Sequence, residues 1–165
     1  MATVTTALKA VHGYGNPGRK PFFIENEIDF ADHTVDPSAG DVVQALTIPA
    51  GTMIMAAGME VVTAPTLDND SDDDVVATLG TDTDADKYVA AFDFDAASAG
   101  DYAPAVTGTG GAEVHGTANT LDITFSATSA DGISAGKVRV WAVLMDIEGL
   151  GSDKSANEVD RDVLA

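Results

Sequence analysis

Residues 41–66, DVVQALTIPAGTMIMAAGMEVVTAPT, decide the fold of this chain. Residues 42–48 are rich in β-branched and aliphatic side chains, and residues 53–63 form a longer and more apolar run. Pro49 and Gly51 stand between the two runs and interrupt any continuous helix or strand. The pattern therefore predicts two strands that meet at a corner. Because apolar and polar residues alternate only partly, at least one face of the sheet should be well covered.

Other segments outward from this stretch also favour strands. Residues 22–30, FFIENEIDF, place Ile24, Asn26, Ile28 and Phe30 on one face. Residues 120–127 and 137–147 alternate in the same way, and residues 75–79 form a short apolar run. Residues 87–94, KYVAAFDF, fit either a strand or a short helix.

Short strands separated by Gly-, Pro- and Asp-rich loops predict an all-β protein. We expect a single-domain, jelly-roll-like β-sandwich over residues 21–148, with long acidic loops. Residues 1–20 are predicted to be an extended N-terminal arm, and residues 149–165 a C-terminal tail. The 165-residue chain is too short for two comfortable domains, contains no cysteine and has no apolar run near the ~20 residues needed to span a bilayer. Its N-terminus lacks a basic start followed by an apolar core, so no secretory signal is expected.

Charge is strongly unbalanced, with 27 acidic and 8 basic residues and a formal net charge of −19. Residues 21–136 carry a single base, Lys87. Residues 1–20 carry three bases, Lys9, Arg19 and Lys20, and no acid. Such a chain repels phosphate groups, so we predict no nucleic-acid partner. High Asp with little Lys also resembles proteins of halophilic archaea and their viruses. In molar salt the Debye length falls to ~3 Å and the repulsion is screened.

Candidates for metal binding and catalysis are few. Asp68, Asp70 and Asp72 alternate within an acidic loop and could present oxygens to Ca²⁺. The EF-hand pattern fails there because Asp73 stands where it requires glycine and Leu79 where it requires glutamate, so a solvated loop is the alternative. The histidines at 12, 33 and 115 are scattered, and no nucleophile–base motif occurs. We therefore expect no cofactor and no enzymatic activity.

Two groups of residues are candidates for a partner interface. The arm holds Tyr14, Arg19 and Lys20 beside Phe22. On residues 137–147, Trp141, Val143 and Met145 share a face with Lys137 and Arg139, opposite the more apolar face. Exposed apolar rows of this kind mark interfaces, and Met53, Met55 and Met59 could extend the row. The alternative is that these residues fill a two-sheet core and the chain is a monomer.

Four runs of this sequence resemble a family of small virion proteins of tailed phages, described as capsid cement, decoration or structural proteins. They are VVQALTIPAGTMIMAAGMEVVTAPTLD, LGTDTDADKYVAA, NTLDITFSA and GKVRVWAVLMDI, within residues 22–147. The acidic loop is longer here than in the family and interrupts its LD-x-G spacing. The resemblance implies a β-sandwich that trimerises on the outside of an icosahedral shell, bound to the major capsid protein. With the acidic composition, it points to a tailed virus of a halophilic archaeon.

Three functions follow from these observations. The first is a capsid decoration protein, located on the virion exterior and in the host cytoplasm before assembly, with no membrane partner. The second is another virion part, such as a tail, turret or fibre-base module. The third is a cell-surface or carbohydrate-binding β-module of a halophile.

Overall fold

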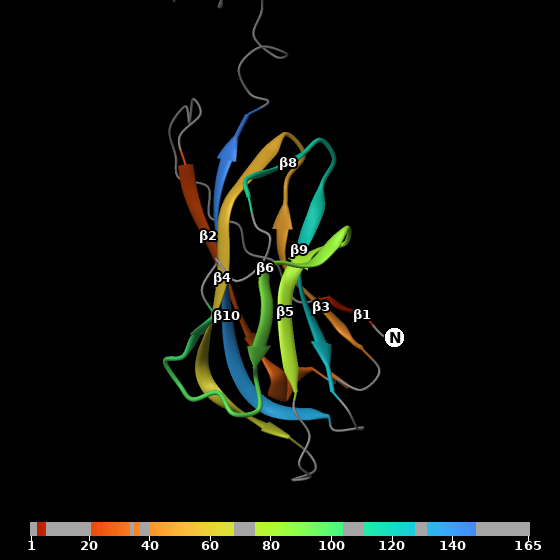
Figure 1. Cartoon of the computed structure of the whole chain (residues 1–165), viewed down its shortest axis with the longest axis vertical. Coiled ribbons are helices and arrows are strands. Elements are labelled where there is room, and N and C mark those ends of the chain that lie inside the picture. The colour runs from red at the N-terminus through yellow and green to blue at the C-terminus, as the bar shows by residue number, and fades with distance from the viewer. Residues whose placement is uncertain are drawn as a thin grey trace, which may run out of the picture.

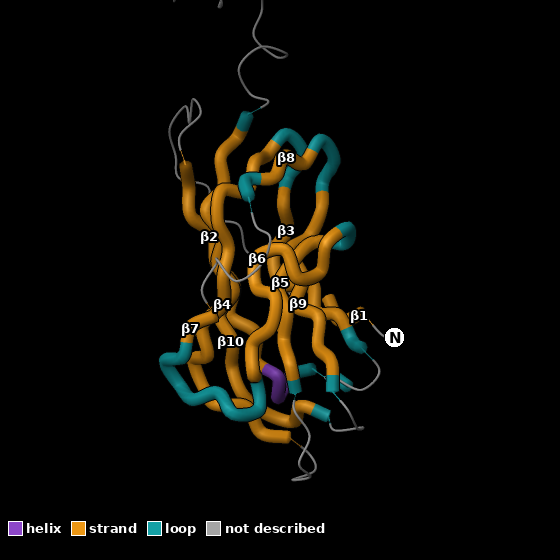
Figure 2. Tube along the Cα trace, viewed as in Figure 1, coloured by secondary structure: helices purple, strands orange, loops and turns teal. Residues whose placement is uncertain are grey.

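The computed structural model describes residues 3–5, 21–33, 35–36, 40–67, 75–103, 111–127 and 132–147. These residues form two sheets that pack face to face (Figures 1 and 2). Apart from the short 3₁₀ helix η1 (Phe30–Asp32), the regular elements of this part of the chain are all strands. The predicted single-domain β-sandwich is thus confirmed.

The first sheet has the strand order β1-β3-β9-β5-β6. Its strands are β1 (Thr3–Thr5), β3 (Val42–Ile48), β9 (Asn119–Ser126), β5 (Val76–Thr81) and β6 (Asp84–Asp93). β1 runs parallel to β3, so the first residues of the predicted arm belong to a sheet. Residues 87–94, which fit strand or helix by sequence, lie almost entirely in the edge strand β6.

The second sheet has the order β2-β10-β4-β7, and β8 also pairs with β4. Its strands are β2 (Pro21–Asp29), β10 (Ile133–Asp146), β4 (Thr52–Leu67), β7 (Tyr102–Ala103) and β8 (Glu113–His115). β4 is longer than the run of residues 53–63 predicts, because β10 is equally extended and pairs with it from Thr52 to Leu67. Pro65 is tolerated in β4 because it falls at a register shift, where its missing N–H breaks no regular ladder.

The corner predicted between residues 48 and 52 is where the chain changes sheets. β3 belongs to the first sheet and β4 to the second. Gly51 adopts φ +70°, a left-handed conformation that favours glycine. Its N–H donates to the carbonyl of His115 at 2.8 Å, and its carbonyl accepts from the N–H of Ile147 at 2.9 Å. The corner is therefore held by backbone bonds to both β8 and the end of β10.

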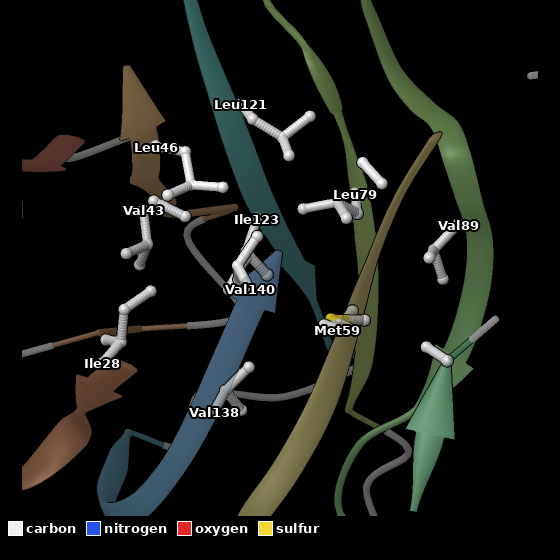
Figure 3. Close-up of a cluster of buried hydrophobic side chains, with 14 of the residues drawn as sticks. Ile28, Val43, Leu46, Met59, Leu79, Val89, Leu121, Ile123, Val138 and Val140 are labelled. Carbon is white, nitrogen blue, oxygen red and sulfur yellow. The ribbon is translucent and has the colours of Figure 1, made fainter. Parts of the chain in front are cut away.

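The core lies between the sheets and is almost entirely apolar (Figure 3). Ile28, Met59, Val138 and Val140 of the second sheet meet Val43, Leu46, Leu79 and Ile123 of the first. Phe30, Phe94 and Phe125 form an edge-to-face group with ring centroids 5.3–5.7 Å apart. Each such aromatic pair adds ~0.5–1.5 kcal/mol beyond area burial.

One polar side chain crosses this core. Asn26 lies on the inward face of β2, as its spacing predicts, and its amide donates to the carbonyl of Ala45 at 3.0 Å. Ala45 is the extra residue of a bulge, since the β3–β9 register passes from Gln44 directly to Leu46. A bulge leaves a carbonyl outside the ladder, and Asn26 satisfies it.

Candidate functional site

The candidate site is the outer face of the second sheet, called here the β2–β10–β4 face. Along β10 the even-numbered residues from Val138 to Leu144 are at most 1% exposed, and the odd-numbered residues are half-buried on the other side. Trp141 and Met145 therefore point away from the core, as the sequence predicts. Phe23 of β2 lies opposite Val143 and is 52% exposed.

Trp141 is the centre of this face. Its indole stacks on the ring of Phe23, with centroids 6.1 Å apart and an interplanar angle of 18°. Across the ladder its partner on β4 is Gly58. A Cβ at Gly58 would lie 2.7 Å from Cζ2 of Trp141 and 3.1 Å from the carbonyl oxygen of Ala103. The missing side chain of Gly58 therefore lets the indole lie close against the sheet.

The apolar surface continues from Trp141 toward the sheet corner. Met145 pairs with Met53, which in turn pairs with Val114 of β8. A register shift opposite Val143 makes Met55 the extra residue of a bulge. Met55 is 43% exposed and Val114 is 55% exposed. This surface is called the apolar end of the face, and it is the kind of patch that marks a contact site.

The other end of the same face is ionic. Arg139 lies 3.0 Å from Glu60 and 3.2 Å from Glu27, while Lys137 lies 2.8 Å from Asp29. The hydrogen bond from Lys137 makes the largest contribution to lowering the pKa of Asp29, and the hydrogen bond from the backbone N–H of Ala31 makes the next largest. Exposed pairs like these add little stability. Their main effect is to neutralise carboxylates locally, since Lys137 and Arg139 are two of the three bases among the described residues.

The third described base, Lys87, belongs to a polar cluster that links the two sheets. Lys87 of β6 forms a 3.0 Å ion pair with Glu113 of β8, and Nε2 of His115 lies 3.7 Å from the same carboxylate. Asn119 is within 3.5 Å of His115 Nδ1 and donates to Asp82 at 2.7 Å. Although His115 is far from the other histidines in the sequence, it is not isolated, because β8 places it at 7% exposure beside Glu113 and Asn119.

Tyr88 completes this cluster. The Tyr88 hydroxyl is buried. Burial makes the largest contribution to raising the pKa of Tyr88 well above its ordinary value of 10.0, and the charge of Glu113 makes the next largest. The Tyr88 hydroxyl is thus neutral, and the neighbouring Glu113 carboxylate is already paired with Lys87. This arrangement fits a structural role for the cluster. The side chains of this cluster come from β6, β8 and β9. Because these strands are far apart in the sequence, no local motif reveals the cluster.

Several predicted site residues lie elsewhere. Met59 is not part of an exposed row, because the bulge at Met55 reverses the alternation and places Met59 in the core at 1% exposure. Phe22 is half-buried against the core opposite Leu144, so the exposed aromatic residue of β2 is Phe23. Alternation in residues 22–30 already separates these two rings. Tyr14, Arg19, Lys20, Asp68, Asp70 and Asp72 lie outside the described residues.

Within the described residues, no group of three or more His, Cys, Asp or Glu side chains is placed to hold a metal ion. In the same part of the chain, no helix has the length and apolar character needed to cross a membrane.

Comparison with known proteins gives a structural answer only. No protein-family model matches the chain, and no curated protein sequence matches it. Three solved phage capsid structures contain chains of similar fold. A chain of the cyanophage Pam1 capsid asymmetric unit aligns with a TM-score of 0.54 and 19% identity, over 84% of this chain and 93% of that one.

The second similar chain comes from the acidic stable capsid of Helicobacter pylori bacteriophage KHP30, with a TM-score of 0.50, 12% identity, and 76% and 86% coverage of the two chains. The third comes from the capsid of Ralstonia phage GP4, with a TM-score of 0.50, 12% identity, and 92% and 100% coverage. At these identities the likeness concerns the fold, which this chain shares with chains of phage capsids over nearly their whole length.

Proposed function

We propose that this protein is a structural component of a tailed-virus particle that decorates the outside of the icosahedral shell and stabilises it without catalysis. The observation that carries the proposal is the shared fold, which spans 86–100% of each similar chain from three phage capsid structures. Those chains come from phage capsids, and the IPAGT corner and the GKVRVWAV strand resemble virion proteins of tailed phages. Sequence and fold thus support the same role by separate routes.

The β2–β10–β4 face is the proposed contact surface. It brings Phe23, Trp141, Met145 and Val114 onto one side of the sandwich, next to an ionic end where acids and bases are paired. Apolar side chains supply contact area, and the adjoining charges set orientation. The proposed partners are the major capsid protein and further copies of this chain in a homotrimer.

A trimer suits the proposed role for a general reason. Each contact between a small sandwich and a shell can be weak if several are made together, because linked contacts multiply through effective concentration. Cyclic symmetry closes the assembly and avoids filaments. Light scattering in 3 M salt tests this: a mass near three times the 16.9 kDa chain supports the trimer, and a mass near 16.9 kDa refutes it in solution.

The charge of the chain supports an exposed location and a salty habitat. Among the described residues outside the β2–β10–β4 face, Lys87 is the only lysine or arginine, and the net charge of −19 disfavours contact with packaged nucleic acid. We propose a virus of a halophilic archaeon as the source, with the protein in the host cytoplasm before assembly.

Copy number in purified virions tests the proposed function. A decoration protein should be present in hundreds of copies per particle, a tail or fibre-base module in a handful, and a host protein in none. Quantitative mass spectrometry distinguishes these outcomes, and either of the last two rejects shell decoration.

The contact face is tested separately by adding purified protein back to shells that lack it. Phe23→Ser should abolish or strongly reduce binding, because it removes a ring that is 52% exposed and that stacks on Trp141. Val76→Ser is the matched control, since Val76 is half-buried on the outer side of the opposite sheet. Equal binding by the two variants would reject this face as the contact surface.

A further inference from the structure

A second candidate site lies on the opposite side of the molecule, on the outer face of the first sheet. Asp122 points outward from β9, because its neighbours Leu121 and Ile123 point into the core. An outward carboxylate is normally solvated, yet Asp122 is only 7% exposed. Its Oδ1 atom has no hydrogen-bond partner within the part of the chain that the structure describes. A buried carboxylate oxygen in this state is costly and requires an explanation.

The cover over Asp122 comes from the β5–β6 hairpin. Gly80 of β5 is the register partner of Asp122, so the two residues share a face with Cβ positions ~5 Å apart. A Cβ at Gly80 would overlap the carbonyl oxygen of Asp84 and lie 2.7 Å from that of Ala85. The chain thus folds back over its own sheet at a position that only glycine allows. Two backbone carbonyl oxygens therefore lie against Gly80, the residue that pairs with Asp122 across the ladder.

These carbonyls lie where the β5–β6 ladder is irregular. The register passes from Leu79↔Val89 to Thr81↔Asp84, which leaves Ala85 without a register partner on β5. Asp82, in the turn, adds a second carboxylate, one oxygen of which accepts from Asn119 at 2.7 Å. The hydroxyl of Thr120 donates to Asp122. Oδ1 of Asp122 nevertheless has no hydrogen-bond partner among the described residues.

We propose that this hairpin holds a hard cation of the Ca²⁺ class between Asp122, Asp82 and the carbonyl oxygens of Asp84 and Ala85. Calcium accepts mixed carboxylate and carbonyl ligands in irregular geometry and fills its remaining positions with water, whereas Mg²⁺ gives up its water reluctantly. The site contains two carboxylates and takes its other ligands from the backbone. It is therefore compatible with the absence, among the described residues, of any group of three or more His, Cys, Asp or Glu side chains placed to hold a metal ion. None of its residues belongs to the Asp-rich run 68–74 of the sequence.

The competing explanation is that Asp122 is protonated and donates its O–H to one of the carbonyls. Burial raises the pKa of Asp122, opposed by the hydrogen bond from Thr120 and reinforced by the nearby charge of Asp82, so both explanations agree with its environment. They differ in their response to calcium. A cation would stabilise the ionised carboxylate, whereas a protonated carboxyl would leave the stability of the protein indifferent to calcium.

The test uses the full-length protein after dialysis against chelator. The probe is CaCl₂ alone, measured by isothermal titration and thermal melting, with MgCl₂ and NaCl at matched ionic strength as comparisons. We expect CaCl₂ at a hundredfold excess over Kd to raise Tm by roughly 5 °C or more. Asp122→Asn and Asp82→Asn should each weaken this binding at least tenfold.

Asp86→Asn is the matched control, because Asp86 is an exposed acid of β6 outside this group of oxygens. It removes the same charge and should leave the titration unchanged. Any binding by residues 68–74 persists in all three variants, so the number of ions bound per chain isolates this site. Equal calcium responses in Asp122→Asn and Asp86→Asn, or no response of the wild type, would overturn the proposal.

Discussion

The contact between Trp141 and Gly58 predicts a specific energetic coupling. In Gly58→Ala the new Cβ would lie 2.7 and 2.9 Å from the Cζ2 and Cε2 atoms of the indole. Favourable carbon–carbon separations are ~3.5–4.0 Å, so the ring must move outward by about 1 Å. Overpacking of this kind costs ~1–3 kcal/mol. Alanine is otherwise preferred to glycine within a strand by ~0.5–1 kcal/mol, so the expected net loss lies between ~0 and ~2.5 kcal/mol.

A double-mutant cycle separates these two terms. Trp141→Ala removes the clash with the indole and the stack on Phe23, but it leaves the 3.1 Å contact with the carbonyl oxygen of Ala103. Gly58→Ala in that background should therefore be close to neutral, because this contact offsets the ~0.5–1 kcal/mol preference for alanine. The coupling energy between the positions should then be ~1–3 kcal/mol. Guanidinium unfolding followed by far-ultraviolet circular dichroism measures it without relying on the tryptophan that is removed. All variants must be compared at one protein concentration, because assembly would change apparent stability.

Gly116→Ala serves as the control for the loss of glycine flexibility. Gly116 has open space where a Cβ would be built, so its substitution should change stability by no more than ~0.5 kcal/mol. The reasoning fails if Gly58→Ala costs the same with and without Trp141. That result would mean that the backbone at Gly58, and not the indole, requires glycine.

Three further outcomes follow from the charge, the pKa of Asp122 and the N-terminal segment. Thermal melts should show a higher Tm at 3 M than at 0.1 M NaCl, because salt screens the repulsion of a chain at −19, and an unchanged or lower Tm would contradict the halophilic interpretation. In chelator, Asp122→Asn should unfold at a higher temperature than wild type at pH 7. Burial raises the folded-state pKa of Asp122 above its ordinary value of 3.8, so the penalty is absent below 3.8, grows as pH rises through the folded-state pKa and is constant above it. The advantage of the variant should thus disappear near pH 3.8, and an advantage independent of pH would exclude ionisation as its cause. Deleting residues 1–20 should leave a folded sandwich by circular dichroism, since the described part of this segment is only the edge strand β1, but the shorter protein should no longer decorate shells; normal decoration would remove the arm from the interface.

The sequence determined the longer strands and most of the core of this protein, but not the short strands β1, β7 and β8. Alternation separated Ile24 and Ile28 from Phe23, and Val138 and Val140 from Trp141, because side chains of a strand point alternately to its two faces. Pro49 and Gly51 located the corner at which the chain changes sheets, since proline ends a ladder and glycine permits the left-handed turn. These are local properties of the backbone, which neighbouring residues decide.

Tertiary structure decided the bulges and the burial of polar side chains, which the alternation of apolar and polar residues along a strand cannot predict. The bulge at Met55 arises in the pairing of β4 with β10, and it moves Met59 from the predicted outer row into the core. The burial of His115 and Asp122 depends on β8 and the β5–β6 hairpin folding over other strands. Such contacts join residues that are distant in the chain, and their geometry depends on twist, register and bulges that accumulate over whole sheets. A periodic pattern reports which side a residue faces, but only the packed sheets determine what lies on that side.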